Sequence, residues 1–282
     1  MDKTIEQMRQ DLARSPYAVG TQTHYVKSAL RMAAHFGRDP ANVTRDEIRG
    51  YIDHLASRGR SASWLKMEYA ALVFLFRKTL GRPDHISFVS WPRQRSVLPT
   101  VLSLDETKRL LDAITHPRYQ AIAMVMYATG LRIAEALAIQ VRDIDGPRGV
   151  LHVRCGKGGR PRTVPLSSSL HGWLREYWAK QRPPTPFLFA SHRTNRPPQS
   201  GTVVAALHRA AEEAGIHKHV TPHVLRHSFA THLLENGTDV RVIQAMLGHA
   251  SINTTARYTR VATHVIKSVP SPLDLLPTKP PR

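Results

Sequence analysis

The chain has 282 residues, with 40 Lys and Arg against 21 Asp and Glu, which gives a formal net charge of +19. This excess is more than solubility requires and indicates a polyanionic partner, nucleic acid first of all. The sequence has no apolar run of membrane-spanning length and no signal-peptide core, so a membrane protein is disfavoured and we expect a cytoplasmic one. The single thiol, Cys155, excludes an internal disulfide and a multi-cysteine zinc site.

The first part of the chain predicts an all-helical domain at 1–81. A capping box of Thr44 with Glu47 begins one helix, and Ser61 caps the next. Apolar periodicity supports helices at about 3–14, 21–36, 44–57 and 61–80.

Residues 82–100 predict an interdomain linker. Helix formation is interrupted by three prolines, at Pro83, Pro92 and Pro99. The same segment carries three arginines that we expect to contact a nucleic-acid backbone, namely Arg82, Arg93 and Arg95.

Residues 101–269 predict a second domain, which is mixed α and β. A capping box of Ser103 with Glu106 begins it, and an apolar helix over about 118–129 ends at Gly130. Arg132 then begins another helix. The chain is mostly helical again after Ser167, and a proline-rich tail follows at 270–282.

Two β-prone segments, 150–154 and 162–166, flank a glycine-rich turn and predict a hairpin with Lys157 at its tip. We expect Arg160 and Arg162 beside this turn to contact nucleic acid. Lys157 has two interpretations, a simple phosphate contact or a proton donor. Its spacing alone favours the phosphate contact.

The sequence that follows Thr221 predicts a helix whose N-terminus can bind an anion such as phosphate. Thr221 is a good N-cap and Pro222 a good first residue, so His223 lies in the first turn, where free N–H groups favour a phosphate. Arg226 and His227 share its face at the i+3 and i+4 positions. The opposite, apolar face carries Leu225, Phe229 and Leu233. The alternative is an ordinary solvated basic face.

Other residues strengthen the phosphate interpretation. Arg132 offers a planar fork for two phosphate oxygens, although a pair with Glu135 at i+3 explains it equally well in isolation. His249 precedes Tyr258 across a predicted helix break at Gly248. Tyr258 alone would more often be a half-buried packing residue.

Together these residue types suit phosphoryl transfer to a phenol. Tyr258 is the expected nucleophile, and Arg132 with Arg226 would stabilise the charge that gathers on the nonbridging oxygens. A phenol has a pKa near 10, so a base is needed, for which His223 is the first choice. His249 would bond a phosphate oxygen.

Four segments occur in the order that the tyrosine recombinase (phage integrase) family shows, and they resemble its signature segments: 128–133, 156–158, 223–227 and 247–258. The resemblance implies that six residues surround a scissile DNA phosphate and that Tyr258 among them forms a 3′-phosphotyrosyl link. The six are Arg132, Lys157, His223, Arg226, His249 and Tyr258. The bond energy is retained, so neither a cofactor nor a metal is implied.

The resemblance also implies a fold and an assembly. It is specific at 128–258 and loose in the helical domain, which is similar to the family's core-binding domain in size and helical character only. The family forms a C-shaped clamp around double-stranded DNA, as four protomers on two sites, with a C-terminal helix exchanged between protomers. Ala134 departs from the small hydroxyl residue that many members carry there, and we expect no separate arm-binding domain before the first helix.

Several functions remain open at this point. The favoured one is site-specific recombination by the integrase or transposase of a mobile element. Chromosome or plasmid dimer resolution of the Xer kind and type IB topoisomerase activity use the same chemistry. A non-catalytic DNA-binding protein is a third class. A zinc hydrolase with ligands His223 and His227 is disfavoured because Arg226 would repel the dication.

Overall fold

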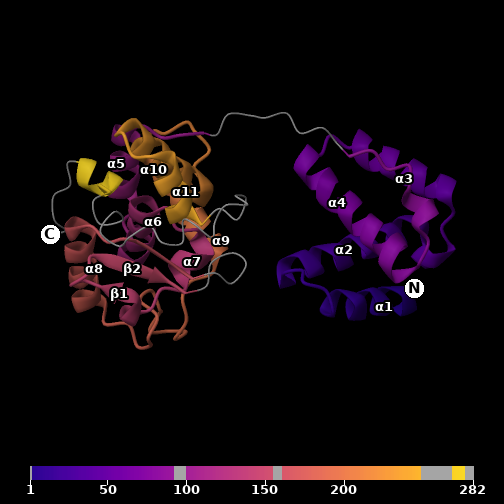
Figure 1. Ribbon diagram of the computed structural model, residues 1–282, viewed down its shortest axis with the longest axis horizontal. Helices are drawn as coiled ribbons and strands as arrows, with labels where there is room; N and C mark the ends of the chain where they lie inside the picture. The colour runs from indigo at the N-terminus through magenta and orange to yellow at the C-terminus, as the bar shows by residue number, and fades with distance from the viewer. Residues whose placement is uncertain (1, 92–99, 155–160, 249–268, 277–282) are drawn as a thin grey trace. The chain divides into compact units, whose positions relative to one another are not determined.

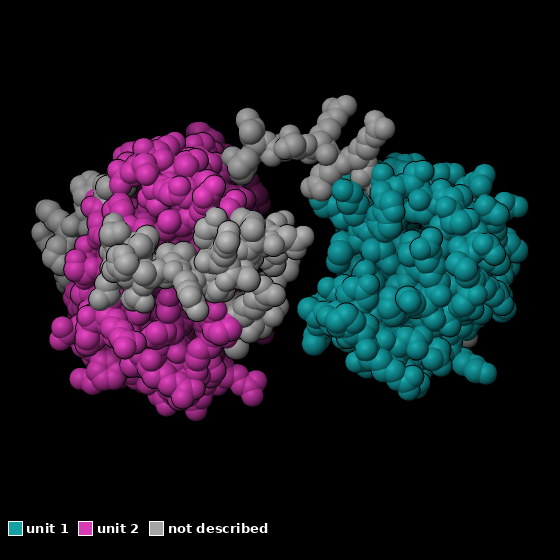
Figure 2. Space-filling model, viewed as in Figure 1, with its two compact units in different colours: residues 1–97 teal, residues 98–282 magenta. Residues whose placement is uncertain are grey.

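The computed structural model describes residues 2–91, 100–154, 161–248 and 269–276 (Figure 1). The chain forms two compact units, residues 1–97 and 98–282, which Figure 2 shows in different colours. Each unit has its own hydrophobic core, and neither core takes residues from the other unit. Within the described ranges, no helix has both the length and the apolar character needed to cross a membrane.

The first unit is all-helical, as predicted. Its α-helices in the described residues are α1 (Asp2–Ala13), α2 (Val19–Phe36), α3 (Arg45–Ser57) and α4 (Ala62–Phe74). The helix predicted to reach residue 80 continues beyond α4 as a π-helical turn, η2 (Leu75–Thr79). The capping box of Thr44 with Glu47 and the Ser61 cap are both present, so local sequence explains where α3 and α4 begin.

The start of the predicted linker packs onto this first unit. Pro83–Ile86 forms a short 3-10 helix, η3, and Ile86 is buried in the unit's core. Phe88 lies under two guanidinium groups of α3, with 5.8 Å from Arg45 and 4.8 Å from Arg49 to the ring centroid. Prolines therefore end α-helix formation here without detaching the chain from the unit.

The second unit is built around α6 (Pro117–Thr129), which is buried from Ala121 to Thr129. Gly130 ends α6 in a left-handed conformation, as predicted. Around α6 pack α5 (Leu104–Ala113), α8 (Ser168–Gln181), α9 (Ser200–Glu213) and α10 (Pro222–Glu235). The remaining helices of the described part are α7 (Ile133–Leu137) and α11 (Val240–Leu247).

A small antiparallel sheet lies beside these helices, in the order β1 (Ile144–Asp145), β2 (Val150–Val153), β3 (Arg162–Pro165). The predicted pairing of the two β-prone segments is confirmed, with Val153 opposite Arg162, while the glycine-rich turn predicted between them lies outside the described residues. Sequence patterning missed β1, whose two residues are too few for a periodic signal. The α11 helix packs against β3, which brings two distant chain segments together.

The first residues of the proline-rich tail also pack on the second unit. A 3-10 helix, η5 (Pro272–Leu275), contacts α6, α8 and α10. Leu273 and Leu276 are buried in the core, and the Ser271 hydroxyl donates a hydrogen bond to the Ala128 carbonyl over 3.3 Å. The high proline content of this stretch is therefore compatible with ordered packing.

Candidate active site

Arg226 is buried on α10 with only 5% of its surface exposed. Its two terminal nitrogens donate to carbonyls at the ends of two helices, Nη1 to Gly130 over 2.7 Å and Nη2 to Leu247 over 2.6 Å. Helix C-termini carry unpaired carbonyls and the negative end of the helix dipole, so they stabilise a cation. These two contacts fix the guanidinium between the ends of α6 and α11.

The N-terminus of α10 has the predicted form. Thr221 accepts a hydrogen bond from the Val224 N–H over 3.3 Å, and Pro222 is the first helical residue. His223 and His227 are exposed on α10, whereas Arg226 between them is buried. The three basic side chains thus do not form one solvated face.

Arg132 is the N-cap residue of α7 and lies near Arg226. Its Nη1 donates to Glu135 over 3.0 Å, and its N–H donates to the same carboxylate over 2.9 Å. Its Nη1 also lies 3.5 Å from the Leu247 carbonyl, which accepts from Arg226. Arg132 and Arg226 therefore converge on one backbone oxygen. Arg132 also forms the ion pair with Glu135 that the sequence offered as the alternative to phosphate binding.

Arg162 completes this arginine cluster, defined here as Arg132, Arg162 and Arg226 around Glu135. It binds Glu135 through two parallel bonds, Nη1 to Oε1 over 2.9 Å and Nη2 to Oε2 over 2.7 Å. Its Nε donates to the Met246 carbonyl over 2.8 Å. With 11% of the side chain exposed, the guanidinium is committed to the protein, although we predicted a nucleic-acid contact.

The arginine cluster carries three positive charges against one buried carboxylate. Burial raises the pKa of Glu135, but hydrogen bonds from Arg162 and from the Arg132 N–H outweigh it and hold the pKa below its usual range. Burial, together with repulsion from Arg132 and Arg162, lowers the pKa of Arg226 to about 10. Arg226 therefore stays protonated at neutral pH, and the cluster has an unbalanced positive charge suited to an anion.

His227 is exposed, but partial desolvation of its ring lowers its pKa from the usual value, and the nearby charges of His223 and Arg226 lower it further. Its imidazole is therefore neutral near pH 7. A neutral imidazole can donate one hydrogen bond to a phosphate oxygen without adding charge.

Two glycines allow the close packing of the arginine cluster. At Gly130, φ is +65° and an added Cβ would lie 2.5 Å from the Phe229 ring, so no other residue fits without movement. At Gly248, φ is +61° and an added Cβ would lie 3.1 Å from Cδ of Arg162. The predicted break at Gly248 is confirmed, because it is the left-handed C-cap of α11.

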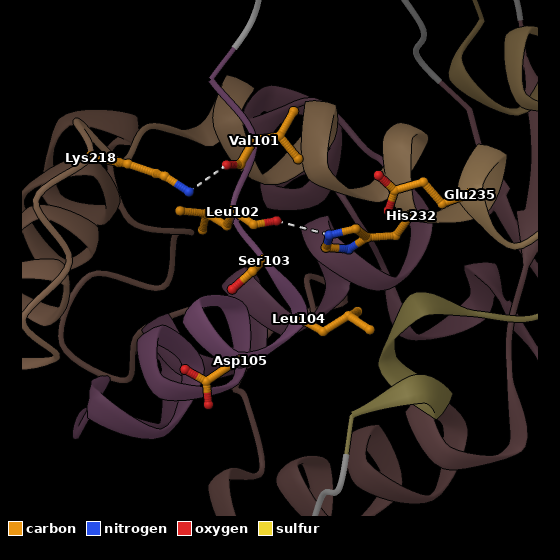
Figure 3. A pocket seen from close by; sticks show the side chains of 8 residues that line it. All are labelled: Val101, Leu102, Ser103, Leu104, Asp105, Lys218, His232 and Glu235. Carbon is orange, nitrogen blue, oxygen red and sulfur yellow. Dashed lines mark hydrogen bonds between the residues drawn. The ribbon is translucent and has the colours of Figure 1, made fainter.

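A hydrogen-bonded strap, defined as Val101 and Leu102, runs over the end of α10 and lines the pocket of Figure 3. Both backbone groups of Leu102 are bonded: its N–H donates to Ser228 over 2.9 Å, and its carbonyl lies 2.8 Å from Nε2 of His232. Lys218 donates to the Val101 carbonyl over 2.9 Å. Sequence reasoning missed these contacts because they join segments far apart in the chain.

His232 also connects the strap to α6. Its Nδ1 lies 2.9 Å from the Tyr127 hydroxyl, inside the core. Nε2 faces a carbonyl, which can only accept, so Nε2 carries a proton and donates to Leu102. His232 therefore joins the strap to the buried Tyr127 of α6 through both of its ring nitrogens.

Several predicted residues lie outside the described ones: Arg93, Arg95, Lys157, Arg160, His249 and Tyr258. Of the predicted DNA contacts that are described, Arg82 is exposed and donates to the Ala41 carbonyl over 2.6 Å. Ala134 is exposed on α7. Over the described ranges, no three His, Cys, Asp or Glu side chains are grouped so that they could hold a metal ion.

Comparison with protein families matches both units. Residues 100–264 match the phage integrase family, and residues 4–86 match the phage integrase N-terminal SAM-like domain. The chain belongs to the phage integrase family. It is a site-specific tyrosine DNA recombinase, and its partner is DNA.

Relatives within the family cover nearly the whole chain. A Sinorhizobium fredii protein named integrase/recombinase y4qK is 39% identical over 280 residues, which cover 98% of this chain and 90% of the relative. The tyrosine recombinase XerA of Pyrococcus furiosus is 36% identical and covers 89% of each chain. A crystal structure of XerA recombinase matches with a TM-score of 0.51 at 29% identity, over 94% and 95% of the two chains.

A second structural likeness concerns the fold alone. A lambda integrase dimer bound to a COC′ core site matches with a TM-score of 0.70 at 22% identity, over 89% of this chain and 95% of the other. The predicted fold class, mainly helical with a small sheet, is thereby confirmed.

Proposed function

We propose that this recombinase cuts DNA by attack of Tyr258 on a phosphodiester that the arginine pair, Arg132 and Arg226, holds by its nonbridging oxygens. One observation carries this proposal. The two guanidinium groups come from different helices, yet both donate toward the Leu247 carbonyl. Cations fixed before the reaction lower the barrier where charge develops, because they need not reorganise during the step.

The bonding of Arg226 leaves capacity for a phosphate. A guanidinium has five N–H groups, and the two carbonyl contacts account for one on each terminal nitrogen. The uncompensated charge of the arginine cluster also favours an anion, since burial makes an unpaired cation unfavourable. A bound phosphodiester would balance part of that charge.

The other residues complete the reaction. The phenolic oxygen of Tyr258 forms the bond to phosphorus while the bond to the 5′-oxygen breaks, which leaves a 3′-phosphotyrosyl link. His223 takes the phenolic proton, Lys157 gives a proton to the 5′-oxygen, and His249 donates to a phosphate oxygen. Attack by a 5′-hydroxyl of another strand then reverses the step and joins the strands.

We propose that both units contact DNA. Both carry excess positive charge, with 16 Lys and Arg against 9 Asp and Glu up to Arg95 and 24 against 12 beyond it. The proposed domains are 1–81, which binds DNA, the linker 82–100, the catalytic domain 101–269 and the tail 270–282. The proposed backbone contacts are Arg82, Arg93, Arg95, Arg160 and His227.

The assembly is proposed by analogy. A lambda integrase tetramer bound to a Holliday junction has the same fold, with a TM-score of 0.70. We propose four protomers on two DNA sites, with the C-terminal helix exchanged between neighbours. Because its substrate is DNA, we place the enzyme in the cytoplasm.

For the biological role we propose the integrase or transposase of a mobile element. The similarity of y4qK, named an integrase/recombinase, supports this. The similarity of XerA supports dimer resolution as the second candidate. A plasmid assay distinguishes the two roles. Strand exchange between cloned element ends supports a mobile-element integrase, and resolution of a dimer of a plasmid that carries one cloned chromosomal site supports dimer resolution. Relaxation of any supercoiled plasmid would instead indicate a type IB topoisomerase.

The test of the chemistry is a suicide substrate, a duplex of its own site nicked beside the scissile phosphate so that the released strand diffuses away. The unsubstituted chain should accumulate a covalent adduct, and Tyr258→Phe should form none while still binding. Arg226→Lys loses the two-pronged contact and should slow adduct formation about 10²-fold. An undiminished adduct from Tyr258→Phe would refute the nucleophile.

A further inference from the structure

The bonds of Arg162 connect three elements that the sequence keeps apart. The side chain starts on β3, binds Glu135 on α7 with both terminal nitrogens and binds the Met246 carbonyl near the end of α11 with Nε. Two parallel bonds between a guanidinium and a carboxylate fix both distance and orientation. Arg162 therefore determines how β3, α7 and α11 lie relative to one another.

The contacts continue from Arg162 to the proposed arginine pair. Glu135, held by Arg162, accepts two bonds from Arg132. Arg162 and Arg226 bind successive carbonyls at the end of α11, those of Met246 and Leu247. A displacement of Arg162 would therefore reach both members of the pair.

The stem of Arg162 also lies against Gly248, where an added Cβ would come within 3.1 Å of Cδ and 3.2 Å of Nε. Gly248 immediately precedes His249 in the sequence, and β3 begins five residues after Lys157. Arg162 thus lies against Gly248 in the segment 247–258 and follows the segment 156–158 closely in the sequence.

We propose that Arg162 is a positioning residue of the recombination reaction, which aligns the arginine pair and the end of α11 with β3 and does not itself bind DNA. This inference rests on the proposed function. It replaces our expectation that Arg162 contacts the DNA backbone. The effect of its loss should fall on the cleavage step, since a misplacement of about 1 Å is enough to slow a reaction about 10²-fold.

Arg154 provides a matched control. It also forms two bonds to one carboxylate, Nε to Asp143 over 2.7 Å and Nη2 over 2.9 Å. It follows β2, whose last residue pairs with Arg162, so it anchors the other side of the same hairpin. None of its hydrogen bonds in the described structure reaches Glu135 or α11.

The experiment compares the whole chain with Arg162→Gln, Arg162→Lys and Arg154→Lys on the suicide substrate at saturating protein. We expect Arg162→Gln to slow adduct formation about 10²-fold and Arg162→Lys about 10-fold. Arg154→Lys should stay within about 3-fold of the unsubstituted chain. Arg162→Lys keeps a cation beside Glu135, so the test survives if Arg162→Gln does not fold.

The salt dependence of DNA affinity separates positioning from DNA contact. A lost phosphate contact reduces the slope of log K against log salt by about 1, whereas a positioning residue leaves the slope unchanged. A reduced slope with normal cleavage at saturation would overturn the inference, as would equal cleavage rates for all variants. If the unsubstituted chain formed no adduct at all, the proposed function would be contradicted, and the inference about Arg162 would lose its basis.

Discussion

At the scale of single residues, the arginine cluster depends on helix ends. Gly130 and Leu247 offer carbonyls that no further helical turn uses, and Arg226 occupies both. Glu135 holds the remaining two arginines together. The position of each arginine therefore depends on backbone carbonyls as well as on charge. Two predictions follow at this scale.

The first concerns Gly130. Gly130→Ala should lower the free energy of unfolding by about 2–4 kcal/mol, because it adds overpacking against Phe229 to the strain of a left-handed residue. The control is Gly172→Ala inside α8, where a Cβ meets nothing within 4 Å and which should raise it by about 0.5–1 kcal/mol. Chemical denaturation measures both, and effects of the same sign would contradict the prediction.

The second concerns Glu135. Glu135→Gln should lower the free energy of unfolding by about 3–5 kcal/mol, because it leaves buried arginines without their partner. The folded-state pKa of Glu135 is lowered, so its contribution is complete above the unfolded value of about 4.3 and is lost as the pH falls toward the folded value.

Thermal unfolding measured from pH 7 to pH 3 tests this sign. The unsubstituted chain should lose more stability than Glu135→Gln over the acidic part of that range. Asp105→Asn, which removes an exposed carboxylate paired with Arg109, should have little effect at any pH. Parallel curves for Glu135→Gln and the unsubstituted chain would show that Glu135 is not the group concerned.

At the scale of elements, α10 has two functions along its length. Its first turns present His223 and position Arg226, and its last turns hold the strap through Ser228 and His232. In the sequence, the strap follows directly after the linker segment 82–100. The helix that carries Arg226 therefore also binds the strap, the segment that follows the linker in the sequence.

Ser228→Ala tests the strap. The variant leaves the buried Leu102 N–H without a partner, which should cost about 1–3 kcal/mol of stability. The Leu102 amide should also exchange hydrogen faster than before. General destabilisation would instead speed exchange at many amides, so faster exchange confined to Leu102 identifies the local effect. Ser169→Ala on the exposed surface of α8 is the control and should stay within about 0.5 kcal/mol. Unchanged Leu102 exchange would contradict the strap.

At the scale of the whole molecule, two cores of different size share no residue. Units with separate cores generally unfold as separate cooperative systems. Calorimetry of the whole chain should therefore show two transitions, and Gly130→Ala and Glu135→Gln should lower the same one. A single transition that both variants shift would contradict independent units.

Much of this protein was predictable from the sequence, because the signals are local. The helices of the first unit, the caps at Thr44, Ser61 and Thr221 and the hairpin depend on residues a few positions apart. The excess charge predicted the DNA partner, and four ordered segments predicted the family, which the comparisons confirm.

Only the tertiary structure decided how the site is held together. A sequence shows that Arg132 and Glu135 are one helical turn apart, but not that Arg162 binds the same carboxylate or that Arg226 reaches two helix ends. Arg162 and an exposed phosphate-binding arginine have the same chemistry and the same local pattern. Burial against α7 and α11 distinguishes them, and burial depends on the packing of elements far apart in the chain.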